Sequence, residues 1–102
     1  MSIWFKNYSV EDVETKGTMV EHLGIEVTEL GDDFVRGTMP VDDRTKQPFG
    51  ILHGGASVAL AETLASYGGY LTIDPERYHV VGVEINANHL KMAKKGLVTG
   101  KC

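Results

Sequence analysis

The sequence predicts an α+β domain in which one long helix packs on an antiparallel sheet. Three observations carry this prediction: an apolar helical segment over about 54–71, extended runs with alternating polarity on both sides of it, and turn signals between these elements. A chain of 102 residues is long enough for one domain with a modest core. We therefore expect residues 1–102 to form a single domain.

The first third of the chain predicts a short helix followed by a β-hairpin. Ser9, with two acids in the turn that follows, is typical of a helix start, and this helix is expected to end near Gly17. Residues 23–28 alternate apolar and polar side chains, as a strand does. The Gly-Asp-Asp sequence at 31–33 is a turn signal, and residues 34–39 form a second extended run.

The middle of the chain predicts a polar loop over 41–50 and then the long helix. The helix is expected to begin at Gly54 or Gly55 and to end near Leu71. A stripe of small apolar residues should let the helix lie close to the sheet. The stripe consists of Val58, Ala61, Ala65 and Gly68.

After the helix, residues 74–76 predict a loop and residues 81–88 predict a long strand with one apolar face. A turn at 94–96 then leads into another strand from Leu97. Because that strand stops at Cys102, part of the helix and one sheet edge are left uncovered. Either a partner chain completes the sheet, or the sequence is a truncated version of a longer domain.

Composition narrows the class of protein. A net charge of −4 and a pI near 5.5 argue against binding to nucleic acid or to an anionic membrane. The single cysteine, Cys102, has no partner for an intrachain disulfide and fits a reducing compartment. Acids near the start argue against a signal peptide, and the polar residues of the long helix argue against a membrane span. We expect a soluble, cytoplasmic protein.

Glu62 is the one full charge between Lys46 and Asp74. An unpaired carboxylate in an apolar helix costs free energy, whereas in a dry groove it can act as a base or a nucleophile. The alternatives are that it emerges at the surface or pairs with a charge from elsewhere. Ser66, four residues on, lies on the same helical stripe and can hydrogen-bond the carboxylate or a water, or can bond back to its own helix.

The start of the long helix, His53-Gly54-Gly55, is suited to holding a carbonyl oxygen. Glycines allow close approach of the backbone, and the first helical turn offers free N–H groups with a partial positive charge. One such donor to a developing oxyanion is typically worth about 3 kcal/mol. Gln47 can add a neutral donor from the loop. The plain alternatives are a loop-to-helix junction without a ligand and an exposed loop amide.

Other kinds of site are disfavoured. His53 and His89 have no metal-site spacing, so we predict no metal, and no nucleophile elbow, phosphate loop or dinucleotide motif is present. Lys91, Lys94 and Lys95 share one turn. They can hold the phosphates of a nucleotide-bearing substrate or simply form a solvated turn beside a sheet edge.

Three stretches together resemble the hotdog-fold acyl-CoA thioesterases, in particular the branch of menaquinone and enterobactin biosynthesis. They are RTKQPFGILHGG at 44–55, Ala61-Glu62, and VGVEINANH at 81–89. The resemblance covers nearly the whole chain. It implies a hotdog fold with a long central helix wrapped by an antiparallel sheet, no cofactor, and a homodimer or dimer of dimers (a homotetramer) with active sites at the interface. Members of the family continue with about two further strands, so the resemblance also implies truncation at the C-terminus.

The resemblance implies hydrolysis of an aromatic acyl-CoA, with 1,4-dihydroxy-2-naphthoyl-CoA the leading candidate and Glu62 as nucleophile or general base. The other catalytic residues that it implies are Gly55, Gln47, His53 and Ser66. The substrate-binding residues that it implies are Gly54, His89, Lys91, Lys94 and Lys95. The alternatives are a non-catalytic acyl-CoA-binding module, an inactive truncated thioesterase, or hydration and dehydration of an acyl thioester by His53 and Glu62.

Overall fold

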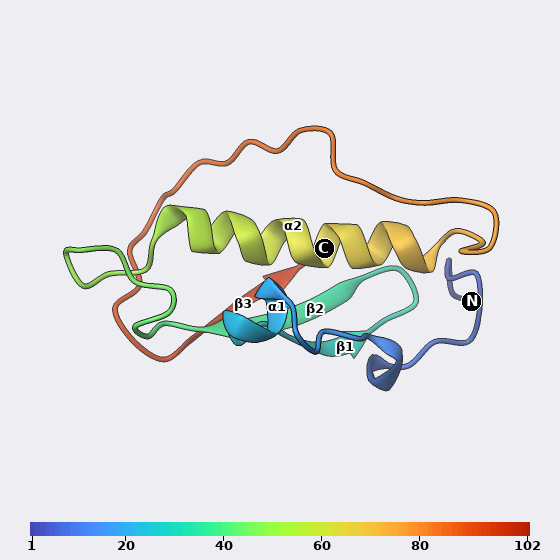
Figure 1. Ribbon diagram of the computed structural model, residues 1–102, viewed down its shortest axis with the longest axis horizontal. Coiled ribbons are helices and arrows are strands. Elements are labelled where there is room, and N and C mark those ends of the chain that lie inside the picture. The colour runs from blue at the N-terminus through green and yellow to red at the C-terminus, as the bar shows by residue number, and fades with distance from the viewer.

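The computed structural model describes residues 1–102 and places one long helix across a three-stranded antiparallel sheet (Figure 1). The helix is α2 (Gly54–Leu71), and the strands, in their spatial order, are β1 (Glu26–Leu30), β2 (Val35–Pro40) and β3 (Leu97–Lys101). Before them come a 3-10 turn, η1 (Val10–Asp12), and a one-turn helix, α1 (Met19–His22). The predicted α+β plan, the hairpin and the bounds of the long helix are confirmed.

The core lies between α2 and the central strand β2, whose residues are alternately buried. Leu64 of α2 sits over Gly37 and Gly100, which face each other in the β2–β3 register. A methyl group on either glycine would lie within 2.8 Å of a Leu64 methyl carbon. The core cluster consists of Ile25, Val35, Met39, Ala56, Leu60 and Leu64.

This packing corrects the predicted stripe of small helix residues. Ala61 and Ala65 are exposed, whereas Leu60 and Leu64 face the sheet. At Leu60 and Leu64 the close approach of the two layers comes from glycines in the strands and leucines on the helix, the reverse of the expected arrangement, whereas Gly68 lies against Val35 of β2 as expected. A stripe of small residues and a stripe of large ones both satisfy helical periodicity, so the pattern alone does not choose between them.

Two boundaries before the hairpin differ from prediction. The first helix is shorter, because Ser9 N–H donates to the Asp12 carboxylate (2.8 Å) and η1 ends there rather than near Gly17. The first strand begins at Glu26, not at residue 23. Gly24 has a φ of +74°, which turns the chain between α1 and β1 before the extended run begins.

The strand predicted at 81–88 is absent. Residues 79–92 make no backbone–backbone hydrogen bond and run along α2 on the side away from the sheet (Figure 1). Val81 and Val83 are 79% and 96% exposed. A strand requires a neighbour for its N–H and C=O groups. No strand of this chain lies beside the segment, so its alternating pattern has nothing to pair with.

Hydrogen bonds of Thr45, which is 2% exposed, hold the loop before α2 in place. Its hydroxyl donates to the Pro40 carbonyl (2.6 Å), and its own carbonyl accepts from His53 N–H (2.8 Å). Leu52 N–H donates to the Ala93 carbonyl (2.8 Å). These bonds fix where α2 begins.

None of the helices combines the length and apolar character that crossing a membrane would require.

Candidate active site

The start of α2 is capped by His53. Its Nδ1 accepts a hydrogen bond from Gly55 N–H at 2.7 Å. The helix therefore begins at Gly54, as predicted, but the N–H group expected to face a carbonyl is held by an imidazole. For Gly55 to polarise a substrate carbonyl, the His53 ring has to turn away and release it.

We expect the His53 cap to contribute to the stability of the fold. We expect His53→Ala to lower the free energy of unfolding by about 1 kcal/mol, because the replaced side chain satisfied one free N–H of the first turn. Urea denaturation of the purified protein measures the change. His79→Ala, an exposed histidine in a segment without backbone hydrogen bonds, is the matched control and should leave the midpoint unchanged. Equal midpoints for both variants would show that the bond contributes nothing.

Glu62 lies near the middle of α2 with a half-buried side chain. Its carboxylate makes neither a hydrogen bond nor an ion pair. Its Oε1 lies against Gly82 of the segment that passes over the helix. The alternative that this charge pairs with a cation from elsewhere is therefore wrong. Ser66 makes no hydrogen bond to its own helix either, so its hydroxyl is available to a neighbour.

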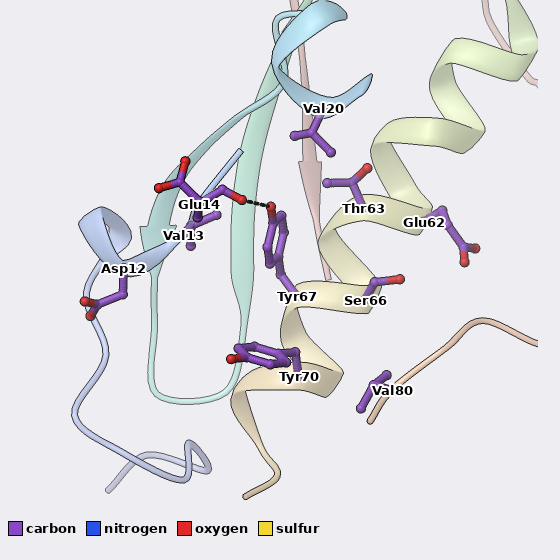
Figure 2. Close-up of a pocket in the computed structure, with 10 residues that line it drawn as sticks. All are labelled: Asp12, Val13, Glu14, Val20, Glu62, Thr63, Ser66, Tyr67, Tyr70 and Val80. Atoms are coloured by element: carbon purple, nitrogen blue, oxygen red, sulfur yellow. Dashed lines mark hydrogen bonds between the residues drawn. The ribbon is translucent and has the colours of Figure 1, made fainter. Parts of the chain in front are cut away.

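Glu62 and Ser66 line a cavity of about 470 Å³ between α2 and the N-terminal segment (Figure 2). Tyr67 and Tyr70 form much of its apolar wall and point toward the N-terminal segment, whereas Glu62 and Ser66 point to the side where Val80 lies. The volume is within the range of small-molecule sites, and such sites combine apolar walls with a few polar groups. This cavity can accept an aromatic group, with the Glu62 carboxylate at the side toward Val80.

Tyr67 joins two segments that are distant in sequence. Its hydroxyl donates to the Glu14 carbonyl at 3.0 Å (Figure 2). Burial raises the pKa of Tyr67, and the Glu14 carboxylate raises it further. The phenol therefore stays neutral and keeps its proton for this bond at neutral pH. The bond holds the N-terminal segment in place as one wall of the cavity.

Glu62 also lines a second cavity, a groove of about 390 Å³ between α2 and residues 82–85. Gly55 lies in the same groove, so the helix start and the carboxylate share one space. Val58 and Ala59 form its floor on the helix. Two of the predicted site residues are thereby brought together, and Glu62 is the residue common to the groove and the aromatic-lined cavity.

A separate cavity of about 390 Å³ gathers four other predicted residues at the helix start. They are Gln47, Gly54, His89 and Lys91. The His89 ring packs on Gly54, where a methyl group would lie 2.9 Å from Nε2. Glu62 does not line this cavity. Lys94 and Lys95 are exposed and line none of these three cavities.

Sequence reasoning missed the tyrosines of the cavity wall and the glycine beside Glu62. Tyr70 follows Ser66 by four residues and Glu62 by eight, so helical spacing was a usable signal for it. Glu14 and Gly82 lacked such a signal, because their contacts with α2 depend on where the flanking segments run.

Comparison with known proteins decides the family. Residues 49–102 match the model of the thioesterase superfamily. This chain belongs to that superfamily. It is 55% identical to the proofreading thioesterase EntH of Cronobacter turicensis and 51% identical to the 1,4-dihydroxy-2-naphthoyl-CoA hydrolase of Escherichia coli. Each alignment covers 98% of this chain and 74% of the relative.

Solved structures agree with the sequence relatives. A thioesterase from Haemophilus influenzae superposes with a TM-score of 0.91 at 48% identity, over 97% of this chain and 70% of that one. A thioesterase variant from Pseudomonas aeruginosa gives a TM-score of 0.94 at 43% identity, over 98% and 73% of the two chains. The predicted hotdog fold and thioester hydrolase class are thus confirmed.

Proposed function

We propose that this thioesterase hydrolyses an aromatic acyl-CoA, with 1,4-dihydroxy-2-naphthoyl-CoA as the leading candidate. The observation that carries the proposal is the place of Glu62, which lines both the groove that begins at Gly55 and the cavity walled by Tyr67 and Tyr70. A thioester in the groove would have its acyl group beside the tyrosines. The name of the Escherichia coli relative supports the choice of acyl group.

The reaction requires a carboxylate, N–H donors and water. The thioester carbonyl would sit at the helix start, where Gly55 N–H, once released by His53, stabilises the oxyanion. Glu62 either attacks the carbonyl carbon or takes a proton from the attacking water. In both routes the C–S bond breaks, and the thiolate leaves and takes up a proton. When water attacks, the new C–O bond gives the free acid directly. When Glu62 attacks, the new C–O bond gives a mixed anhydride, which water then hydrolyses to the free acid and the restored Glu62 carboxylate. Since these groups suffice, we propose a reaction without a cofactor.

Supporting roles follow from the same geometry. We propose that the Ser66 hydroxyl hydrogen-bonds the Glu62 carboxylate or the water, because it has no partner in the protein and lines the same cavity as Glu62. Gln47, Gly54, His89 and Lys91 share the cavity on the other side of the helix start, which suits the coenzyme A arm. We propose that Lys94 and Lys95 contact the coenzyme A phosphates. Both side chains are exposed and lie on the same turn.

The alternative reaction, hydration or dehydration of an acyl thioester, needs His53 and Glu62 to act together. His53 is bonded to Gly55 N–H and lines neither of the two cavities that Glu62 lines. The geometry therefore favours hydrolysis. The contrasting function is that of a non-catalytic acyl-CoA-binding module. Such a module would bind the substrate without turnover, so a turnover assay distinguishes it from a hydrolase.

The proposed assembly is a homodimer or a dimer of dimers. Residues 79–92 have strand-like alternation, exposed valines and no backbone hydrogen bonds in this chain. A second copy that offers a strand edge would satisfy these groups. Active sites beside this segment, which passes over Glu62, would then lie at the interface between copies.

Substrate preference tests the proposal. We expect kcat/KM for benzoyl-CoA and 1,4-dihydroxy-2-naphthoyl-CoA to exceed that for acetyl-CoA and palmitoyl-CoA by at least about tenfold, because a rigid aromatic ring can stack on Tyr67 and Tyr70, whereas an acetyl group lacks this contact area and a palmitoyl chain loses more conformational freedom on binding. Release of free thiol measures the rate for each. A preference for palmitoyl-CoA would overturn the aromatic assignment, and binding of all four without turnover would identify a non-catalytic module.

A further inference from the structure

We propose that Gly82 is a positioning residue that keeps open the space occupied by the Glu62 carboxylate; this rests on the proposed role of Glu62. A methyl group built on Gly82 would overlap Oε1 of Glu62 and lie 3.4 Å from its Cδ and 3.8 Å from Oε2. The three nearest atoms all belong to that one carboxylate. The absence of a side chain at position 82 therefore leaves room for the Glu62 carboxylate.

Backbone conformation does not explain this glycine. The four glycines with positive φ are Gly17, Gly24, Gly50 and Gly96. Gly82 is not among them, so alanine can adopt its backbone conformation. Nor does Gly82 admit a core side chain, as Gly37 and Gly100 do for Leu64. The atoms that an added methyl would meet are the far end of a flexible side chain, which can move aside without disturbing the fold.

The position of this carboxylate is otherwise weakly determined. Glu62 makes no hydrogen bond and no ion pair, and its side chain has three rotatable bonds. Contact with the segment at 82–85, across the groove it shares with Gly55, is what confines it. A methyl group at position 82 would displace the oxygen by about 1 Å, and a displacement of this size can cost about 100-fold in rate.

The first test is Gly82→Ala in the thiol-release assay. We expect kcat to fall about 100-fold with KM nearly unchanged, because the carboxylate moves while the substrate contacts remain. The unfolding midpoint should be unchanged or raised, since alanine in a compatible conformation restricts the unfolded chain. Glu76→Ala, an exposed residue outside the segment and outside both cavities that Glu62 lines, is the control and should leave kcat unchanged. Full activity in Gly82→Ala would overturn the inference.

A rescue experiment separates positioning from a general structural defect. Aspartate is shorter by one methylene, so its carboxylate would withdraw from the added methyl. We expect Gly82→Ala to cost only about twofold in a Glu62→Asp background, against about 100-fold in the parent. Equal losses in both backgrounds would overturn the proposal.

A readout independent of turnover completes the design. The ¹³C chemical shift of the Glu62 carboxyl carbon should change in Gly82→Ala and stay the same in Glu76→Ala. If Glu62→Ala proves fully active, the proposed function fails, whereas the chemical shift still tests whether Gly82 positions the carboxylate. If Glu62→Ala is inactive but Gly82→Ala alters neither the rate nor the shift, only the positioning role fails.

Discussion

Replacing Glu62 by alanine is expected to lower thioester turnover by roughly 10³-fold or more while substrate binding is largely kept. Glu62 is the carboxylate common to the groove that holds Gly55 and to the aromatic-lined cavity. Its removal leaves the N–H donors and both cavities in place but no group there that can attack the carbonyl or activate water. The loss should therefore appear in kcat, with little effect on affinity.

The measurement pairs initial rates of thiol release with calorimetric binding of a non-hydrolysable thioether analogue of benzoyl-CoA. Glu62→Gln keeps the shape of the side chain and removes its charge, so it should lose activity to a similar extent. Glu76→Gln is the matched control, because Glu76 is exposed and lines neither of the cavities that Glu62 lines. Its rate should equal that of the parent. Comparable rates in the parent and in Glu62→Ala would exclude the catalytic assignment.

Local signals in the sequence were enough to predict the helix α2 and to single out the charge of Glu62 within it. The long helix has both its bounds encoded nearby: glycines where it starts and a Pro-containing loop after it. Glu62 was distinctive because no other charge lies within many residues of it along the chain. Both inferences use neighbours in sequence, which is the information that periodicity and composition contain.

Features that depend on contacts between distant segments could not be predicted from neighbours in sequence. The run at 81–88 has the alternation of a strand, but pairing requires a neighbouring strand, and this chain offers none there. The bond from Tyr67 to the Glu14 carbonyl joins residues 53 positions apart. His53 capping Gly55 was also unforeseen, because ring orientation at a helix start is set by the backbone it meets.

The packing of α2 on the sheet leads to the largest expected effect on stability. We expect Leu64→Ala to lower the free energy of unfolding by about 3–5 kcal/mol. Leu64 is 1% exposed, and its two methyl carbons rest over Gly37 and Gly100. Glycines have no side chains that could move into the space left behind, so the cavity would stay open and the cost would lie at the upper end of the range for leucine truncation.

Urea denaturation measures this loss, with Leu90→Ala as the matched control because Leu90 is 94% exposed. The control should change the free energy of unfolding by no more than about 0.5 kcal/mol. Since whole domains are stable by only about 5–15 kcal/mol, Leu64→Ala should also raise the unfolded fraction enough to reduce apparent activity, which added substrate analogue would partly restore. A loss below about 1 kcal/mol would mean that the helix and the sheet do not pack through Leu64 and the two glycines.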